Sequence, residues 1–229
     1  MLFDLRGRGR RRTVKVIYLS LAILMGGGLV LFGIGGNTSG GLFDAIQGNS
    51  GSVNANDVFK KRVETFEKRV QANPSDAEAW KQLASIRFQN ATSGDNYDQG
   101  TQAYTVKGKN ELRRASSSWQ RYLSLEPKQP DDRLANQMVQ AYGPAGLRQY
   151  DEAVKAMEIV IDNRDPTYQL YAQLAVYAHG AKQTRKAKLA EDKAVELAPK
   201  AQRKTIREQI KAGQTQLDGL ASAGQPSSQ

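Results

Sequence analysis

The sequence contains no cysteine, which excludes disulfide bonds, zinc sites built on thiolates and cysteine nucleophiles. A single histidine, His179, leaves too few imidazoles for most metal sites and catalytic triads. No H-x-x-x-H, G-x-S-x-G or P-loop motif occurs in the chain. We therefore expect no catalytic residue, no metal site, no cofactor and no small-molecule substrate. An enzyme, or the regulatory arm of one, would need a polar cluster that the sequence does not contain.

Net positive charge is concentrated near the two ends of the chain. The formal net charge is +10, of which residues 1–15 carry +5 and residues 182–213 carry +6. Residues 16–181 are neutral in sum. This distribution argues against a protein whose whole surface binds nucleic acid.

One long run without charge lies near the N-terminus. Residues 16–36 read VIYLSLAILMGGGLVLFGIGG, which as a helix would span about 30 Å, the thickness of a bilayer core. The stub 1–15 before this run is basic, whereas NTSGG after it is neutral. Because Lys and Arg resist translocation, we predict a single transmembrane helix with its N-terminus in the cytoplasm and the rest of the chain outside. The topogenic basic residues are Arg6, Arg8, Arg10, Arg11, Arg12 and Lys15.

Two alternatives apply to this region. A cleavable signal peptide would have a shorter apolar core and an A-x-A-like exit, and neither feature is present. The arginine-rich stub could also act as an adaptor for nucleic acid or anionic lipid, which would make the cytoplasmic end the functional one.

The remainder of the chain divides into a linker, a helical region and a tail. Residues 37–56 are rich in Gly, Ser and Asn, so we expect a flexible linker. From residue 57 onward, apolar residues recur at helical spacing, as in the stripe Trp80, Leu83, Ala84 and Phe88. We predict an all-α repeat domain over residues 57–213 and a disordered tail over residues 214–229. Prolines end several of the predicted helices, namely Pro74, Pro127, Pro166 and Pro199.

Two segments of this region are similar to each other. QYDEAVKAMEIVIDNRDP and TRKAKLAEDKAVELAP align with Ala153 and Ala187 34 residues apart, and their closing prolines lie 33 residues apart. The pattern resembles that of the tetratricopeptide repeat (TPR) family. First-helix matches are Trp80, Leu83 and Ala84, and also Tyr171, Leu174 and Ala175. Second-helix matches are Ala115 with Trp119 and Ala153 with Met157, and the best inter-helix turn is Tyr150-Asp151-Glu152-Ala153.

The resemblance covers residues 57–213 and implies an α-solenoid of three full repeats, with a half repeat in front and a solvating helix behind. An insertion at residues 92–110 departs from the pattern, and we expect Gly100 and Gly108 to interrupt the helix that should follow it. The segment Gly143-Pro144-Ala145-Gly146 is expected to form a short extra loop. Acidic pairs at Asp131/Asp132 and Asp151/Glu152 are expected at helix starts, where they complement the helix dipole.

The resemblance also implies a concave groove that binds an extended or helical peptide. Its candidate lining residues lie on the first helix of each repeat: Lys81, Ser85, Phe88 and Gln89; Arg133, Asn136 and Gln140; and Gln169, Val176 and His179. His179 could instead simply solvate a helix end. The charged helices between Lys182 and Lys211 are either a second contact face for anionic partners or a solvated face.

These observations favour a non-enzymatic interaction module of the bacterial cell envelope, held at the plasma (inner) membrane by one span. Its partners would be the lipid bilayer and a protein or peptide, and the architecture is similar to that of TPR subunits ancillary to the secretion translocon. Such a module would assist secreted or translocated chains. The alternative within binding is a scaffold for an envelope assembly complex.

Overall fold

The computed structural model describes residues 55–222. This part of the chain contains eight α-helices, which confirms the expected all-α class. The helices are α3 (Ala55–Ala72), α4 (Ala77–Ala91), α5 (Val106–Ser124), α6 (Asp132–Tyr142), α7 (Tyr150–Asp162), α8 (Tyr168–Gly180), α9 (Thr184–Leu197) and α10 (Arg203–Ser222). The basic stub 1–15, the predicted span 16–36 and the linker as far as residue 54 lie outside the described residues. Among the helices of residues 55–222, none has the length and apolar character needed to cross a membrane.

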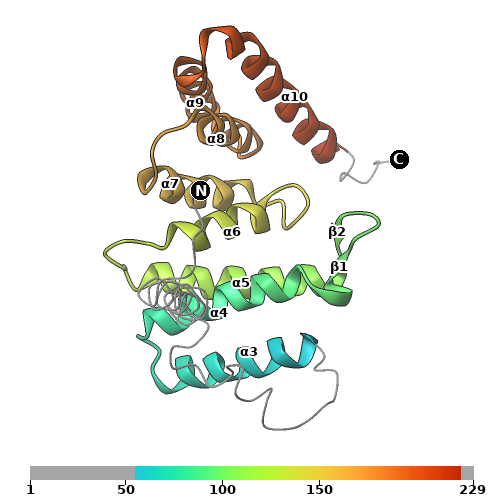
Figure 1. The fold of residues 1–229 in the computed structure, drawn as a ribbon, viewed down its shortest axis with the longest axis vertical. Helices are drawn as coiled ribbons and strands as arrows, with labels where there is room; N and C mark the ends of the chain where they lie inside the picture. The colour runs from blue at the N-terminus through green and yellow to red at the C-terminus, as the bar shows by residue number, and fades with distance from the viewer. Residues whose placement is uncertain (1–54, 223–229) are drawn as a thin grey trace, which may run out of the picture. The chain divides into compact units, whose positions relative to one another are not determined.

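Each helix from α3 to α9 packs mainly on its neighbours in the chain (Figure 1). The strongest contacts join α4 to α5, α6 to α7 and α8 to α9, so these six helices form three consecutive pairs. In front of the first pair, α3 packs on α4, and behind the last pair α10 packs on both α8 and α9. Contacts between α4 and α6 and between α7 and α8 join one pair to the next.

Side-chain caps fix where several helices begin. The carboxylate of Asp76 accepts a hydrogen bond from the backbone N–H of Ala79 at 2.9 Å, and Asp131 accepts from Leu134 at 2.8 Å. These bonds satisfy N–H groups that have no partner within the helix. The acidic residues expected at helix starts are confirmed, since Asp131 caps α6 and Asp151 lies in the first turn of α7.

The core combines alanines, which allow helices to approach closely, with a few large side chains. Trp119 and Tyr142 are the largest of the fully buried side chains, and they belong to one continuous cluster that extends from α4 to α10. Ala84, Ala115, Ala153 and Ala175 in this cluster have no exposed surface. The predicted stripes therefore face the core, including Phe88, which is only 7% exposed.

The insertion between α4 and α5 forms a small ordered structure rather than an interrupted helix. A 3₁₀ turn (Gly94–Asn96) leads into an antiparallel hairpin of β1 (Tyr97–Asp98) and β2 (Ala103–Tyr104), whose two tyrosine rings meet edge to face at 5.1 Å. The Asp98 carboxylate accepts hydrogen bonds from the backbone N–H groups of Gly100 and Thr101 and so closes the loop. Gly108, which we expected to break the helix, lies within the first turns of α5. A Cβ there would lie 2.0 Å from the carbonyl oxygen of Asn96. Gly108 is thus a site of close contact between the 3₁₀ turn and α5.

The C-terminal boundary also differs from the expectation. Helix α10 continues to Ser222, so residues 214–222, which we expected within a disordered tail, are helical. Leu217 in this part is only 4% exposed, and its Cδ1 would lie 2.8 Å from a Cβ placed on Gly180 of α8. Burial of this leucine against α8 explains why the helix extends beyond residue 213.

Candidate functional site

Helices α4 and α6 share a polar surface made partly of the predicted groove residues. Ser85 Oγ on α4 donates a hydrogen bond to Gln137 Oε1 on α6 at 3.2 Å, and Gln89 Nε2 donates to Ser85 Oγ at 3.2 Å. All three side chains are half-buried. Gln137 was not predicted, although it follows the predicted Asn136 directly and both lie near the same helical face. We call Lys81, Ser85, Gln89, Arg133, Asn136, Gln137 and Gln140 the α4–α6 surface.

Lys81 supplies a positioned cation at one end of this surface. Its ammonium lies 2.7 Å from Glu78 and 3.7 Å from Asp131, the residue that caps α6. Partial burial alone would lower the pKa of Lys81, but the hydrogen bond and charge of Glu78 outweigh that effect and raise it. Lys81 is therefore protonated at neutral pH, and part of its charge is already neutralised within the protein.

The α6 side of the surface is more open. Arg133 and Gln140 are exposed and Asn136 is half-buried, one residue per helical turn. These side chains offer a guanidinium and amide groups that can pair with the backbone of a peptide. Phe88, which was predicted to face the groove, lies instead in the hydrophobic core.

The predicted residues of α8 lie apart from this surface, and two of them face α10. His179 Nε2 is 3.0 Å from Asp218 Oδ1 on α10. A Cβ on Gly213 of α10 would lie 2.9 Å from Val176, so the two helices are in close contact there. Gln169 near the start of α8 is exposed. Helix α10 thus contacts Val176 and His179, whereas the predicted residues on α4 and α6, apart from Phe88, remain at the surface.

Within residues 55–222, no group of three or more His, Asp or Glu side chains is arranged to hold a metal ion. No protein-family model matches the chain, and no curated protein matches it in sequence. The described residues thus form consecutive pairs of helices, with a polar surface that α4 and α6 share.

Proposed function

We propose that the chain is a membrane-tethered, non-enzymatic interaction module of the bacterial cell envelope, which binds a protein or peptide partner at the α4–α6 surface. The observation that carries the proposal is the Ser85–Gln137 hydrogen bond, which joins two successive first helices into one polar surface. The side chains of such a surface can exchange the hydrogen bonds they make to one another for hydrogen bonds to a peptide backbone. An envelope module of this kind would assist translocated chains or support an envelope assembly.

The proposal includes a TPR-like assignment of the helix pairs. Three arguments support it: the repeat period of 33–34 residues, the pairing of α4 with α5, α6 with α7 and α8 with α9, and the contact of α10 with both helices of the last pair. In a stack of helix pairs, a terminal helix with a polar outer face covers the last apolar surface. Helix α10 has this character, because Ile206, Ile210 and Leu217 are buried while most of its other residues are exposed.

The membrane tether rests on the charge-free run of residues 16–36 and the basic stub before it, both outside the described residues. With this topology the repeat domain is extracytoplasmic. Its partner would be met close to the bilayer, because the tether raises the local concentration of membrane-associated partners. Protease is added to cells whose outer membrane is permeabilised and whose plasma membrane is closed. It should cleave the repeat domain while the N-terminal stub stays protected.

Charge reversal on the α4–α6 surface tests the binding site. The double variant Arg133→Glu, Gln140→Glu places two acids on its open side. The control variant Gln120→Glu, Arg185→Glu makes the same change of charge at exposed positions of α5 and α9. A photoreactive amino acid at Asn136 of the full-length chain in its native membrane reports the partner contact.

We expect a specific crosslinked product at Asn136 that the Arg133→Glu, Gln140→Glu variant loses and the control variant keeps. Equal crosslinking in both variants, or an equal loss in both, would contradict the assignment of the α4–α6 surface. Circular dichroism of both variants checks that the helices are intact.

A further inference from the structure

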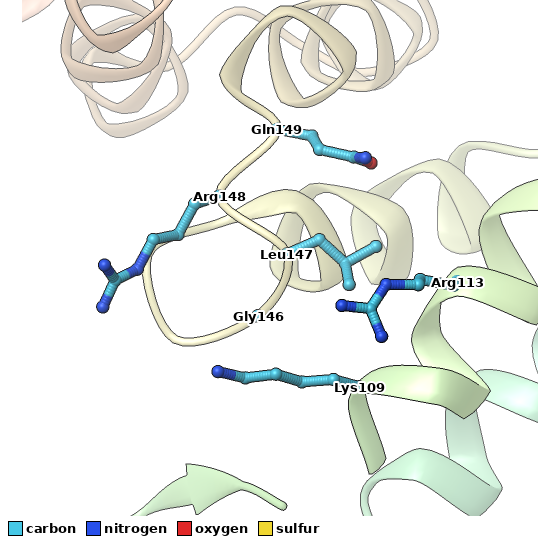
Figure 2. Close-up of a pocket in the computed structure, with 6 residues that line it drawn as sticks. All are labelled: Lys109, Arg113, Gly146, Leu147, Arg148 and Gln149. Atoms are coloured by element: carbon cyan, nitrogen blue, oxygen red, sulfur yellow. The ribbon is translucent and has the colours of Figure 1, made fainter. Parts of the chain in front are cut away.

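A concave region lies between the first half of α5 and the loop that joins α6 to α7. This hollow has a volume of about 360 Å³. Figure 2 shows Lys109 and Arg113 extending from α5 toward the loop, and the side chain of Arg148 extending from the loop on the side away from Arg113. The lining residues are Lys109, Arg113, Gly146, Leu147, Arg148 and Gln149.

The loop wall of the hollow is held in one conformation by backbone contacts. The N–H of Leu147 donates to Ala141 O at 2.8 Å, and that of Gln149 donates to Tyr142 O at 3.0 Å. At Gly146 a Cβ would lie 2.1 Å from Ala141 O, so only glycine allows this approach. Arg148 has a φ of 56°, in the left-handed region, and its Nε donates to Pro144 O at 3.2 Å. The cation of Arg148 is therefore carried on a preformed wall.

The three cations of the hollow have no acidic partner among the described residues. Every ion pair in residues 59–222 involves other basic side chains. Arg113 Nη1 donates only to the neutral Asn110 Oδ1, at 2.7 Å. The hollow is thus lined by three cations that no carboxylate among the described residues neutralises.

Helix α5 adds to this positive potential. Its first turn holds no acidic residue, and Lys107 and Lys109 lie close to the helix N-terminus, where the dipole is already positive. Placing cations there costs helix stability, in contrast to α6, which begins with Asp131 and Asp132. A bound anion would offset this cost.

An exposed apolar side chain lies on the same side of α5. Val106 is 78% exposed and precedes Lys109 and Arg113 by three and seven residues, so the three share a helical face. A ligand that bears carboxylates next to an apolar side chain matches this combination. Nucleic acid matches it less well, because no aromatic residue lines the hollow to stack on a base and residues 16–181 are neutral in sum.

We propose that the hollow binds an acidic segment of a partner protein, whose successive Asp or Glu carboxylates pair with Lys109, Arg113 and Arg148. Guanidinium groups pair with carboxylates through two parallel hydrogen bonds, which gives the site both charge and geometry. The hollow and the α4–α6 surface are built from different residues, so a partner can engage the module at two points.

Binding of a fluorescein-labelled hexaglutamate peptide to the full-length protein in nanodiscs tests this proposal. The hollow variant carries Lys109→Gln, Arg113→Gln and Arg148→Asn, since asparagine tolerates the left-handed φ. The control variant carries Arg185→Gln, Lys200→Gln and Lys211→Gln, which removes the same charge at exposed positions of the C-terminal part. Should the triple hollow variant not fold, the single variant Lys109→Gln takes its place.

We expect the hollow variant to lose at least tenfold in peptide affinity and the control variant less than twofold. Equal losses in the two variants would overturn the proposal, because they would indicate attraction by net charge alone. Binding of inorganic phosphate or of phosphatidylglycerol vesicles in place of the peptide would also overturn it. The Arg133→Glu, Gln140→Glu variant is expected to keep peptide binding, so failure at the hollow and failure at the α4–α6 surface are distinguishable.

Discussion

His179 on α8 contacts Asp218 on α10, with 3.0 Å between Nε2 and the nearer carboxylate oxygen. His179, which the TPR pattern places in the groove, thus takes part in a contact between two helices. Val176 lies one turn earlier on α8 and faces Gly213 of the same partner helix. Helix α10 therefore covers the part of α8 around Val176 and His179, whereas α4 and α6 remain open.

The first prediction concerns the attachment of α10. Replacing Asp218 by Ala should raise the rate of amide hydrogen exchange in the last turns of α10, because it removes the polar link to α8. The free energy of unfolding should fall by only about 0.5 kcal/mol, since both side chains are partly exposed and solvent screens the pair. Asp192→Ala on α9 is the control, because Asp192 pairs with Lys188 within its own helix. Faster exchange of α10 in both variants would contradict the role given to Asp218.

Sequence periodicity predicts the helices well but not the contacts between distant ones. The stripe of Trp80, Leu83, Ala84 and Phe88 predicts a buried face, and α4 buries Leu83, Ala84 and Phe88. Phe88 was also placed in the groove by the TPR pattern, and the two expectations conflict. The structure agrees with the periodicity, because a phenyl side chain gains more free energy in the core than on a polar surface.

Two features could not be predicted because they depend on local backbone contacts. The hairpin is closed by the Asp98 carboxylate and two backbone N–H groups, in a segment with no hydrophobic period. The covering of α8 depends on glycines at the points where α8 and α10 touch, Gly180 and Gly213. Gln137 is different, since it lies four residues after Arg133 and three before Gln140, on the predicted face of α6.

A second prediction follows from two glycines that lie in helices but differ in surroundings. Gly108→Ala should lower the free energy of unfolding by about 2 kcal/mol or more, because the methyl group would overlap the carbonyl of Asn96. Gly219→Ala in α10 should raise it by about 0.5–1 kcal/mol, because nothing lies within 4 Å and alanine favours the helix. Urea unfolding followed by tryptophan fluorescence measures both changes. A stabilising effect of Gly108→Ala would show that the 3₁₀ turn is not packed on α5.

A third prediction concerns Arg87, whose guanidinium joins three helices. Its Nη2 donates to Glu67 on α3 at 2.5 Å, and its Nη1 donates to Ser118 Oγ on α5 at 2.8 Å. Arg87→Lys keeps the charge but cannot make both bonds, so we expect a loss of about 1–3 kcal/mol in unfolding free energy. Arg114→Lys is the control, because Arg114 is exposed and pairs only with Glu111 in its own helix. Its expected loss is below about 0.5 kcal/mol, and losses of equal size in the two variants would count against the bridging role.

The last prediction uses the buried hydrogen bond between Ser116 Oγ and Tyr142 OH, 2.8 Å long. Burial raises the pKa of Tyr142 to about 12, above its unfolded value of about 10. The folded state therefore holds this proton more tightly than the unfolded state. The contribution of the protonated Tyr142 to the free energy of unfolding is complete below about pH 10 and is lost as the pH rises from about 10 to about 12. Ionisation of Tyr142 alone should lower the free energy of unfolding of the wild-type protein by about 1.4 kcal/mol between pH 7 and pH 11.

Tyr142→Phe cannot ionise at this position, so its free energy of unfolding should fall less between pH 7 and pH 11 than that of wild type. At pH 7 the variant should be less stable by about 1 kcal/mol, because Ser116 loses its partner in the core. Near pH 11 the two proteins should be about equally stable in urea unfolding. Ser116→Ala is the matched control, since it breaks the same hydrogen bond but keeps the phenol and hence the alkaline loss. If Tyr142→Phe followed the wild-type pH dependence, the phenol of Tyr142 would not be the group that titrates with folding.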